Sequence, residues 1–327
     1  MVEWEGAPGL SDEEITVRKE HFRILICIDG SDECYQSLQY AARLGGGVDA
    51  DIVLLFVRPV DQGLRSGGLQ VRVARENMLK WGLELPGIKY LKKGFDILGE
   101  LGMMDGEDWS EHVVHTDVDG DPLGDNKTEY VNAKGKMVVL KLKVAPDIAT
   151  GILEQWELGP YDLILFGTSG RWKGPMRSFW DPAVAQKVAI HAPCSVLVAR
   201  DLDVGQGHLI CTDGSDKAME MVRRDGEIAS HCDCPVSLIS VALDVEAEDE
   251  AKANVDKAKK VLADMGIEVK ETIVKVGNPV DEIIEAGPDY SLIVVAESRK
   301  TGLRRFFMES IAYKVMGNAH NSVMIVR

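Results

Sequence analysis

The fold is decided by one short sequence that occurs twice. The chain contains Ile26-Cys-Ile-Asp-Gly-Ser-Asp32, and 184 residues later it contains Ile210-Cys-Thr-Asp-Gly-Ser-Asp216. In both copies an apolar run ends at Asp-Gly-Ser, and a stretch of helical character follows. A buried strand, a tight glycine turn and a helix capped by serine account for this order of residues. The repeat therefore predicts two copies of one α/β domain.

Two further repeats set the lengths of the copies. Tyr161-Asp-Leu-Ile-Leu-Phe-Gly167 matches Tyr290-Ser-Leu-Ile-Val-Val-Ala296, and Ser195-Val-Leu-Val-Ala-Arg200 matches Ser322-Val-Met-Ile-Val-Arg327. The distance between matching segments falls from 184 to 129 and then to 127 residues, so the first copy carries most of the additional length before residue 161. We expect an N-terminal extension (1–22), a first domain (23–200) with an insertion at about 61–135, and a second domain (207–327).

Short apolar runs alternate with helical stretches in the second copy, with strands expected at 209–212, 236–243, 267–276, 292–296 and 323–326. Continuously apolar strands separated by helices are typical of a parallel sheet covered on both faces. The fold class is therefore α/β, with two doubly wound, mainly parallel five-stranded sandwiches. In the insertion we expect helices at 70–83 and 88–101. We also expect a β-hairpin-like excursion, with an acidic turn at 117–126 between strand-like segments at 111–115 and 136–143.

The amino-acid composition argues against several classes of binding partner. The chain of 327 residues has a net charge of −16, and both halves are acidic, so nucleic acid and an anionic membrane surface are poor partners. No apolar run approaches the ~20 residues of a membrane span, and the first 20 residues lack the apolar core of a secretory signal. Six cysteines without a regular framework favour the cytoplasm.

In open α/β sheets, ligands bind beyond the carboxyl ends of the strands. Two loops of the first copy lie there: Asp29-Gly30-Ser31, and Gly167-Thr-Ser-Gly170-Arg171. The first is explained equally well by a capped strand-to-helix turn and by a ligand contact through Asp29, and Asp213 is its counterpart in the second copy. The second offers backbone amides to a phosphate, although a lone G-x-x-G pattern is weakly specific.

Taken together, these motifs resemble those of a tandem universal stress protein. The resemblance rests on the apolar-Asp-Gly-Ser segments, on Gly167-x-x-Gly170 and on His191-Ala-Pro-Cys-Ser-Val-Leu-Val198. In the nucleotide-binding branch of that family, a loop of the form G-x-x-G, nine residues, G-S or G-T wraps the phosphates of ATP, and the first-strand aspartate contacts the nucleoside. The resemblance implies an ATP or AMP site in the first domain. Its candidate residues are Asp29, Gly30, Ser31, Val57, Gly167, Gly170 and Arg171, with Asp213 as the corresponding residue of the second domain.

Both copies depart from the pattern of that branch. The first has Pro182-Ala183 where the closing Gly-Ser belongs, and proline has no N–H to offer a phosphate. The second replaces the three glycines with Ala296, Arg299 and Glu309. A carboxylate at position 309 would repel phosphate, whereas Arg299 would attract it but fill the space that glycine leaves. Nucleotide binding is therefore expected in the first domain rather than in the second.

Other candidate sites have simpler explanations. His112 and His115 would point to opposite faces of a strand, and the Asp117-x-Asp119-x-Asp121 series lacks the glycine and the glutamate of a calcium loop, so we predict a solvated acidic turn and no metal. His231-Cys-Asp-Cys234 reads as a helix end before a buried strand rather than a metal or redox element.

The sequence favours a non-catalytic, stress-related regulatory or scaffold protein that acts through protein–protein contacts, with a residual nucleotide site in the first domain. Two alternatives stay open: an ATP-binding or ATP-hydrolysing enzyme of the same superfamily, and an accessory subunit of a larger enzyme complex that docks through the insertion. In proteins that this chain resembles, the terminal strands of two copies meet. We therefore expect segments 196–199 and 323–326 to pair in an internal pseudo-dimer, and a homodimer of whole chains is left open.

Overall fold

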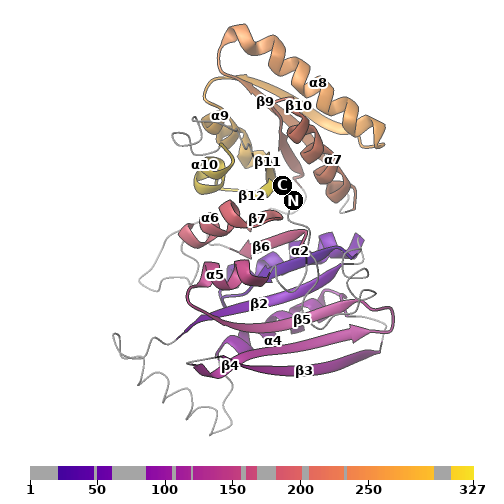
Figure 1. Ribbon diagram of the computed structural model, residues 1–327. Helices are drawn as coiled ribbons and strands as arrows, with labels where there is room; N and C mark the ends of the chain where they lie inside the picture. Colours follow the sequence, from indigo (N-terminus) through magenta and orange to yellow (C-terminus); the bar gives the residue numbers. More distant parts are fainter. Residues whose placement is uncertain are drawn as a thin grey trace. The chain divides into compact units, whose positions relative to one another are not determined.

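The structure is a computed structural model, and it describes residues 21–47, 50–60, 86–104, 108–118, 121–155, 160–167, 182–200, 206–231, 234–297 and 311–327. These residues form two compact units, one up to His191 and the other from Ala192 to Arg327. Both are α/β sheets of the predicted class, and Figure 1 labels their elements. No helix among the described residues is long and apolar enough to cross a membrane.

The first unit is built on four parallel strands. Its elements are β1 (Arg23–Cys27), α2 (Asp32–Gly47), β2 (Asp51–Pro59), α4 (Pro86–Glu100), β3 (Trp109–Val118), β4 (Asp121–Asn132), β5 (Met137–Ala145), α5 (Ile148–Leu153), β6 (Leu163–Gly167) and α6 (Pro182–His191). The strand order is β3-β4-β5-β2-β1-β6, in which β5, β2, β1 and β6 are parallel. Strands β1 and β6 are buried along their whole length, as continuously apolar sequences require.

Helices cover both faces of this sheet. Gly94 of α4 packs on Leu54 of β2, whereas Gly151 of α5 packs on Val57 of the same strand. Residues an odd number apart point to opposite faces of a strand. Helix α4 therefore lies on one face of β2 and α5 on the other, which is the doubly wound arrangement.

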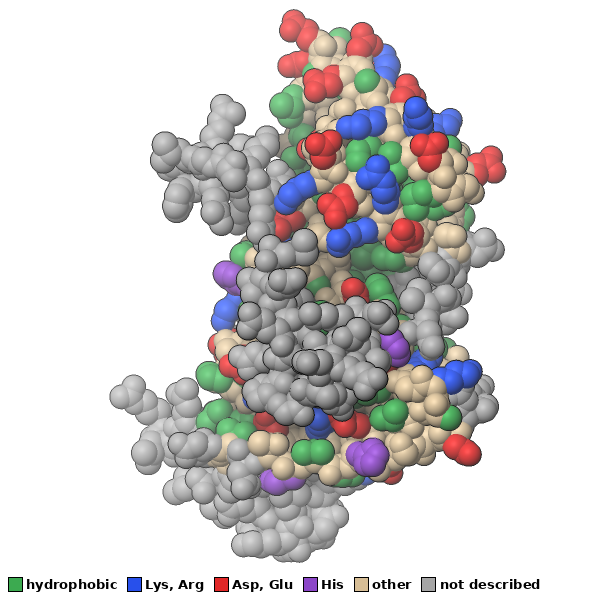
Figure 2. Space-filling view, turned by 45° about the vertical axis from the view of Figure 1, so that its right-hand side comes forward, with side chains coloured by type: hydrophobic (Ala, Val, Ile, Leu, Met, Phe, Trp, Pro, Cys, Tyr) green, Lys and Arg blue, Asp and Glu red, His purple; other side chains and the backbone are tan. Residues whose placement is uncertain are grey.

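The second unit repeats this plan without the hairpin. Its elements are β7 (Ser195–Ala199), β8 (His208–Cys211), α7 (Asp216–His231), β9 (Val236–Ala242), η2 (Val245–Ala247), α8 (Glu248–Asp264), β10 (Val269–Val276), α9 (Pro279–Ala286), η3 (Gly287–Asp289), β11 (Leu292–Ala296), α10 (Ile311–Asn318) and β12 (Ser322–Val326). The strand order is β10-β9-β8-β11-β12-β7. Every strand expected in the second copy is present, and Asn278 caps α9 ahead of a proline at the first helical position. Acidic and basic side chains are interspersed over the surface of α8, in the upper part of Figure 2.

Strand β7 joins the second unit because it pairs with β12. The pairing is antiparallel, with Val323 opposite Val198 and Ile325 opposite Val196. Arg200 follows β7 and caps the end of α10, since its guanidinium donates to the carbonyls of Met316, Ala319 and Asn321. The two segments that we expected to pair thus do so, while the pseudo-dimer of whole domains stays a prediction.

One part of the insertion differs from the prediction. The acidic segment is not a turn between 111–115 and 136–143. Most of it forms β4, which pairs antiparallel with β3 on one side and with β5 on the other. The strand is possible because Asp121 is neutralised by Arg58 and because Gly124 lets the backbone of Thr116 approach closely. The expected helix at 88–101 is α4, and the expected helix at 70–83 lies outside the described residues.

Candidate ligand site at the carboxyl ends of the strands

The strand order places a switch point in each unit. The chain moves from β1 to β2 on one side, and β6 lies on the other side of β1. Phe166 of β6 stands opposite Cys27 of β1, so Gly167 and Asp29 follow neighbouring strands at the same end of the sheet. In the second unit β8 lies between β9 and β11 in the same way. These are the positions at which ligands bind in open α/β sheets.

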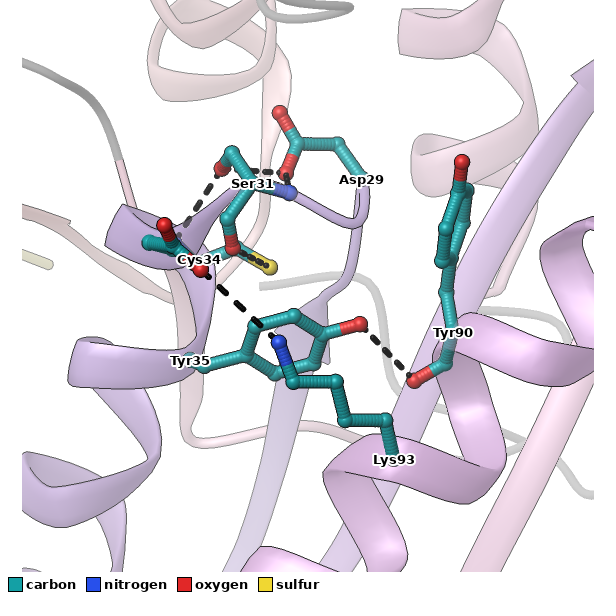
Figure 3. Close-up of polar contacts among 7 residues, drawn as sticks. Asp29, Ser31, Cys34, Tyr35, Tyr90 and Lys93 are labelled. Atoms are coloured by element: carbon teal, nitrogen blue, oxygen red, sulfur yellow. Dashed lines mark hydrogen bonds and ion pairs between the residues drawn. The ribbon is translucent and has the colours of Figure 1, made fainter.

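In the first unit the Asp29 carboxylate is bonded within its own turn. Its Oδ1 accepts hydrogen bonds from the backbone N–H of Ser31 at 2.8 Å and from the Ser31 hydroxyl at 2.5 Å. The Ser31 Oγ in turn accepts from the N–H of Cys34, which caps α2 (Figure 3). Gly30 between them has φ +87°, a conformation that favours glycine. Asp29 is only 7% exposed.

The second unit repeats this geometry. Oδ1 of Asp213 accepts from the N–H of Ser215 at 3.1 Å and from its hydroxyl at 2.6 Å, and Ser215 Oγ accepts from the N–H of Ala218. Gly214 has φ +73°. Asp213, however, is exposed. The explanation by a capped turn therefore holds in both copies, and the two copies differ in how far the aspartate is covered.

Two helix residues that the sequence did not single out complete this site. A Cβ on Gly30 would lie 2.8 Å from the ring of Tyr90, and one on Gly214 would lie 1.9 Å from the Asn254 side chain. Tyr90 belongs to α4 and Asn254 to the corresponding helix α8. In each unit, then, the helix between the second and third parallel strands covers the glycine of the Asp-Gly-Ser turn.

In both units, the lysine three residues after this covering residue contacts the aspartate that begins the helix after the turn. The Lys93 amine lies 3.7 Å from the carboxylate of Asp32 and 4.0 Å from the ring centroid of Tyr35. The Lys257 amine lies 3.9 Å from Asp216 and donates to the carbonyl of Gly214 at 2.8 Å. Lys93 follows Asp29 by 64 residues and Lys257 follows Asp213 by 44, so no constant spacing marks this contact in the sequence.

Aromatic packing surrounds the turn of the first unit. The Tyr35 hydroxyl donates to the Tyr90 carbonyl at 3.2 Å (Figure 3). The centroid of the Tyr90 ring lies 5.8 Å from that of Phe56. Burial raises the pKa of Tyr35, and burial together with the Asp29 charge raises the pKa of the Cys34 thiol to about 12. Cys34 is therefore a protonated core thiol at neutral pH and not a nucleophile.

The structure says less about the other candidate site residues. Val57 is buried and packs on Gly151 of α5, so a nucleoside contact from Val57 stays a prediction. Gly167 is buried at the end of β6. Pro182 and Ala183 open helix α6. Gly170, Arg171, Arg299 and Glu309 lie outside the described residues.

At the carboxyl end of β11, the second unit holds a closed polar network. Glu297 accepts hydrogen bonds from the Tyr313 hydroxyl at 2.9 Å and from Arg327 Nη2 at 3.2 Å, and its second oxygen lies 3.1 Å from Arg327 Nε. The Arg327 and Glu297 side chains are only 7% and 12% exposed. Burial, and then the hydrogen bond to Glu297, raises the pKa of Tyr313. The Glu297 carboxylate thus neutralises the Arg327 guanidinium at this strand end.

The described histidines and aspartates of the hairpin lie on its two strands, β3 and β4. His112 and His115 both lie on β3, at the odd spacing that sends them to opposite faces. Asp121, predicted to be in a solvated turn, is instead buried and paired with Arg58. The described residues contain no cluster of three or more histidines, cysteines or carboxylates suited to a metal ion.

The cysteines follow the prediction in part. Cys27, Cys34, Cys194 and Cys211 are free thiols, and burial raises the pKa of Cys27 well above its usual range. Cys234 is disulfide-bonded, which the scattered spacing of the cysteines did not suggest. Its segment does connect the end of α7 to β9, as expected.

Comparisons with known proteins agree with this architecture. The model of the universal stress protein family matches residues 208–327. A universal stress protein of Methanocaldococcus jannaschii is 30% identical over 137 residues, which cover 36% of this chain and 80% of that protein. Among solved structures, a universal stress protein from Archaeoglobus fulgidus matches 93% of this chain and 96% of its own, with a TM-score of 0.58 and 13% identity. A Pseudomonas aeruginosa protein attributed to the same family matches 95% of this chain and 94% of its own, with a TM-score of 0.58 and 14% identity.

The structural matches extend over both units, and each unit shows the same strand order around its Asp-Gly-Ser turn. The relative in M. jannaschii is similar enough over most of its length to identify the family. This chain belongs to the universal stress protein family.

Proposed function

We propose that this protein is a non-catalytic regulatory or scaffold protein that acts through protein–protein contacts, and that its first unit keeps an adenine-nucleotide site. The observation that carries the proposal is the shared use of Asp29 and Asp213. Each accepts two hydrogen bonds from the serine two residues on, and each of these serines caps a helix. A carboxylate held in this way serves the turn rather than proton transfer.

The nucleotide part of the proposal rests on the other oxygen of Asp29. The two hydrogen bonds that Asp29 accepts from Ser31 both end on Oδ1, and the Cys34 thiol also hydrogen-bonds to this carboxylate. We propose that Oδ2 accepts a hydrogen bond from a hydroxyl or amino donor of a nucleoside. The ring of Tyr90 stands beside this turn and offers an apolar wall (Figure 3). Solved universal stress proteins include complexes with cAMP and with dAMP, but the support for this site comes from the residues of this chain.

The second unit is proposed to be free of nucleotide. The Glu297 carboxylate occupies the carboxyl end of β11 and already neutralises Arg327. This carboxylate would repel an incoming phosphate. Arg327 could not neutralise the phosphate, because it is already paired with Glu297. The difference between the units fits a protein in which one copy senses a ligand and the other serves as structure.

Isothermal titration calorimetry with AMP and ATP tests the proposal. We expect one site per chain, loss of binding in Asp29→Ala, and unchanged binding in the matched variant Asp213→Ala. The same samples are assayed for phosphate release. Turnover by the native chain that disappears in Asp29→Ala would instead favour an ATP-hydrolysing enzyme, and no binding at millimolar nucleotide would remove the nucleotide site.

A further inference from the structure

The outer strand of the first unit is an open sheet edge. Strand β3 is the last in the order of its sheet, and among the described residues only β4 pairs with it. It is ten residues long, whereas edge strands are usually kept short or interrupted. All side chains from Ser110 to Thr116 are exposed, including Val113 at 69% and Val114 at 42%.

This edge is only partly protected against pairing. It carries Glu111 and has a register shift between Thr116 and Val118, but it contains no lysine, proline or glycine, and two valines stand at its centre. The outer strand of the second unit, β10, has Lys270 and Lys275. Lysines on an edge strand discourage pairing with other chains. The centre of β3 is therefore less protected than β10.

The sequence of β3 is complementary to itself in one register. In an antiparallel pair centred on Val113, the two Val113 side chains stand opposite each other, and Glu111 of each strand stands opposite His115 of the other. His112 would then face Val114 on the other side of the sheet. The register centred on Val114 instead places Glu111 opposite Asp117, which is repulsive. Charge therefore selects the first register.

We propose that β3 pairs antiparallel with β3 of a second copy of this chain, about a two-fold axis at Val113. The pair continues the sheet of one subunit into that of the next by main-chain hydrogen bonds. Each valine on the axis is covered by its equivalent, and two symmetric Glu111–His115 pairs fix the register. The proposal is independent of nucleotide binding.

Sedimentation equilibrium of the full chain over a concentration series tests the pairing. We expect a monomer–dimer equilibrium for the native chain. Val113→Asp, which places two carboxylates together on the axis, should yield monomers. The matched control is Val245→Asp, because Val245 is 73% exposed but lies in the second unit, and this variant should dimerise normally. Far-ultraviolet circular dichroism checks that both variants are folded.

A charge exchange separates pairing from loss of folding. His115→Glu places like charges opposite each other twice and should weaken dimerisation roughly tenfold. Combining it with Glu111→Lys places opposite charges in both pairs, so the double variant should dimerise at least as tightly as the native chain. A native chain that stays monomeric, a Val113→Asp dimer, or a double variant no better than His115→Glu would each overturn the proposal.

Discussion

The guanidinium of Arg58 on β2 reaches across the intervening strand β5 to make two hydrogen bonds with the carboxylate of Asp121 on β4. The nitrogen–oxygen distances are 2.5 and 2.8 Å, and both side chains are buried. This pair ties the hairpin to the parallel part of the sheet. A buried pair adds little net stability, but loss of one partner leaves a charge without compensation.

We therefore expect Asp121→Ala to lower the free energy of unfolding of the first unit by about 3–5 kcal/mol. The double variant Arg58→Met/Asp121→Leu should be much less destabilised, because no buried charge remains. Urea denaturation of Arg58→Met, Asp121→Leu and the double variant measures the coupling between the two residues. Additive effects would show that the two side chains act independently.

Gly30 is required both by its backbone conformation and by the Tyr90 ring beside it, and the two requirements can be tested separately. Its φ of +87° nearly equals the +86° of Gly135, but only at Gly30 would an added methyl group meet a ring, that of Tyr90, at 2.8 Å. Gly135→Ala should cost about 1–2 kcal/mol for the backbone conformation alone. Gly30→Ala should cost more, and Tyr90→Ala in the same chain should remove the excess. Equal losses in thermal unfolding for both glycine variants would contradict this packing.

Because of Lys141, the free energy of unfolding is expected to change with pH in the alkaline range. Burial, and then the charge of Lys143, lowers the pKa of Lys141 from 10.5 to about 8. Above pH 8 the folded chain has released this proton, while the unfolded chain holds it until about pH 10.5. The penalty for burying the charge is thus complete below pH 8 and disappears as the pH rises toward 10.5.

Lys141→Met should consequently stabilise the protein at pH 7 by an amount on the order of 3 kcal/mol. Its advantage over the native chain should shrink between pH 8 and 10. The control is Lys260→Met on α8, because Lys260 is exposed and its removal should have little effect at any pH. Denaturation of the three proteins across that range is the measurement, and a pH-independent difference would be the contrary result.

The Glu297 network predicts an unequal response of its members. Glu297→Ala leaves the Arg327 guanidinium nearly buried without its carboxylate, and should cost about 2–4 kcal/mol. Tyr313→Phe removes one hydroxyl and should cost about 1 kcal/mol. Differential scanning calorimetry of both variants checks the order. A larger loss in Tyr313→Phe would show that the hydroxyl, rather than the ion pair, holds the network together.

Much of the fold follows from the sequence because it depends on local patterns. The repeated Asp-Gly-Ser segments predicted both turns and their helices, and the short apolar runs predicted the strands of the second unit. The hairpin was predicted, but its acidic residues were wrongly assigned to a solvated turn, whereas Asp121 and Asp125 lie in β4. Asp121 is buried only because Arg58, 63 residues earlier, reaches it, and no local pattern records such a pair.

The sequence predicted the loops of the site but not the helix residues that pack over them. Asp29 and Gly30 are marked by their position after a buried strand. Tyr90 and Lys93 reach the turn only through the way α4 packs over the sheet, which depends on the register of a helix on distant strands. Their recurrence as Asn254 and Lys257 becomes visible only when the two helices are superposed.

The recurring lysine contact, Lys93 with Asp32 and Lys257 with Asp216, also bears on how the chain evolved. Lys93 and Lys257 hold the same turn in two copies whose loops have since diverged. A contact present in both descendants is inherited most simply from the single-domain ancestor, before duplication. On that account this lysine contact is older than the sequence differences that now separate the two units.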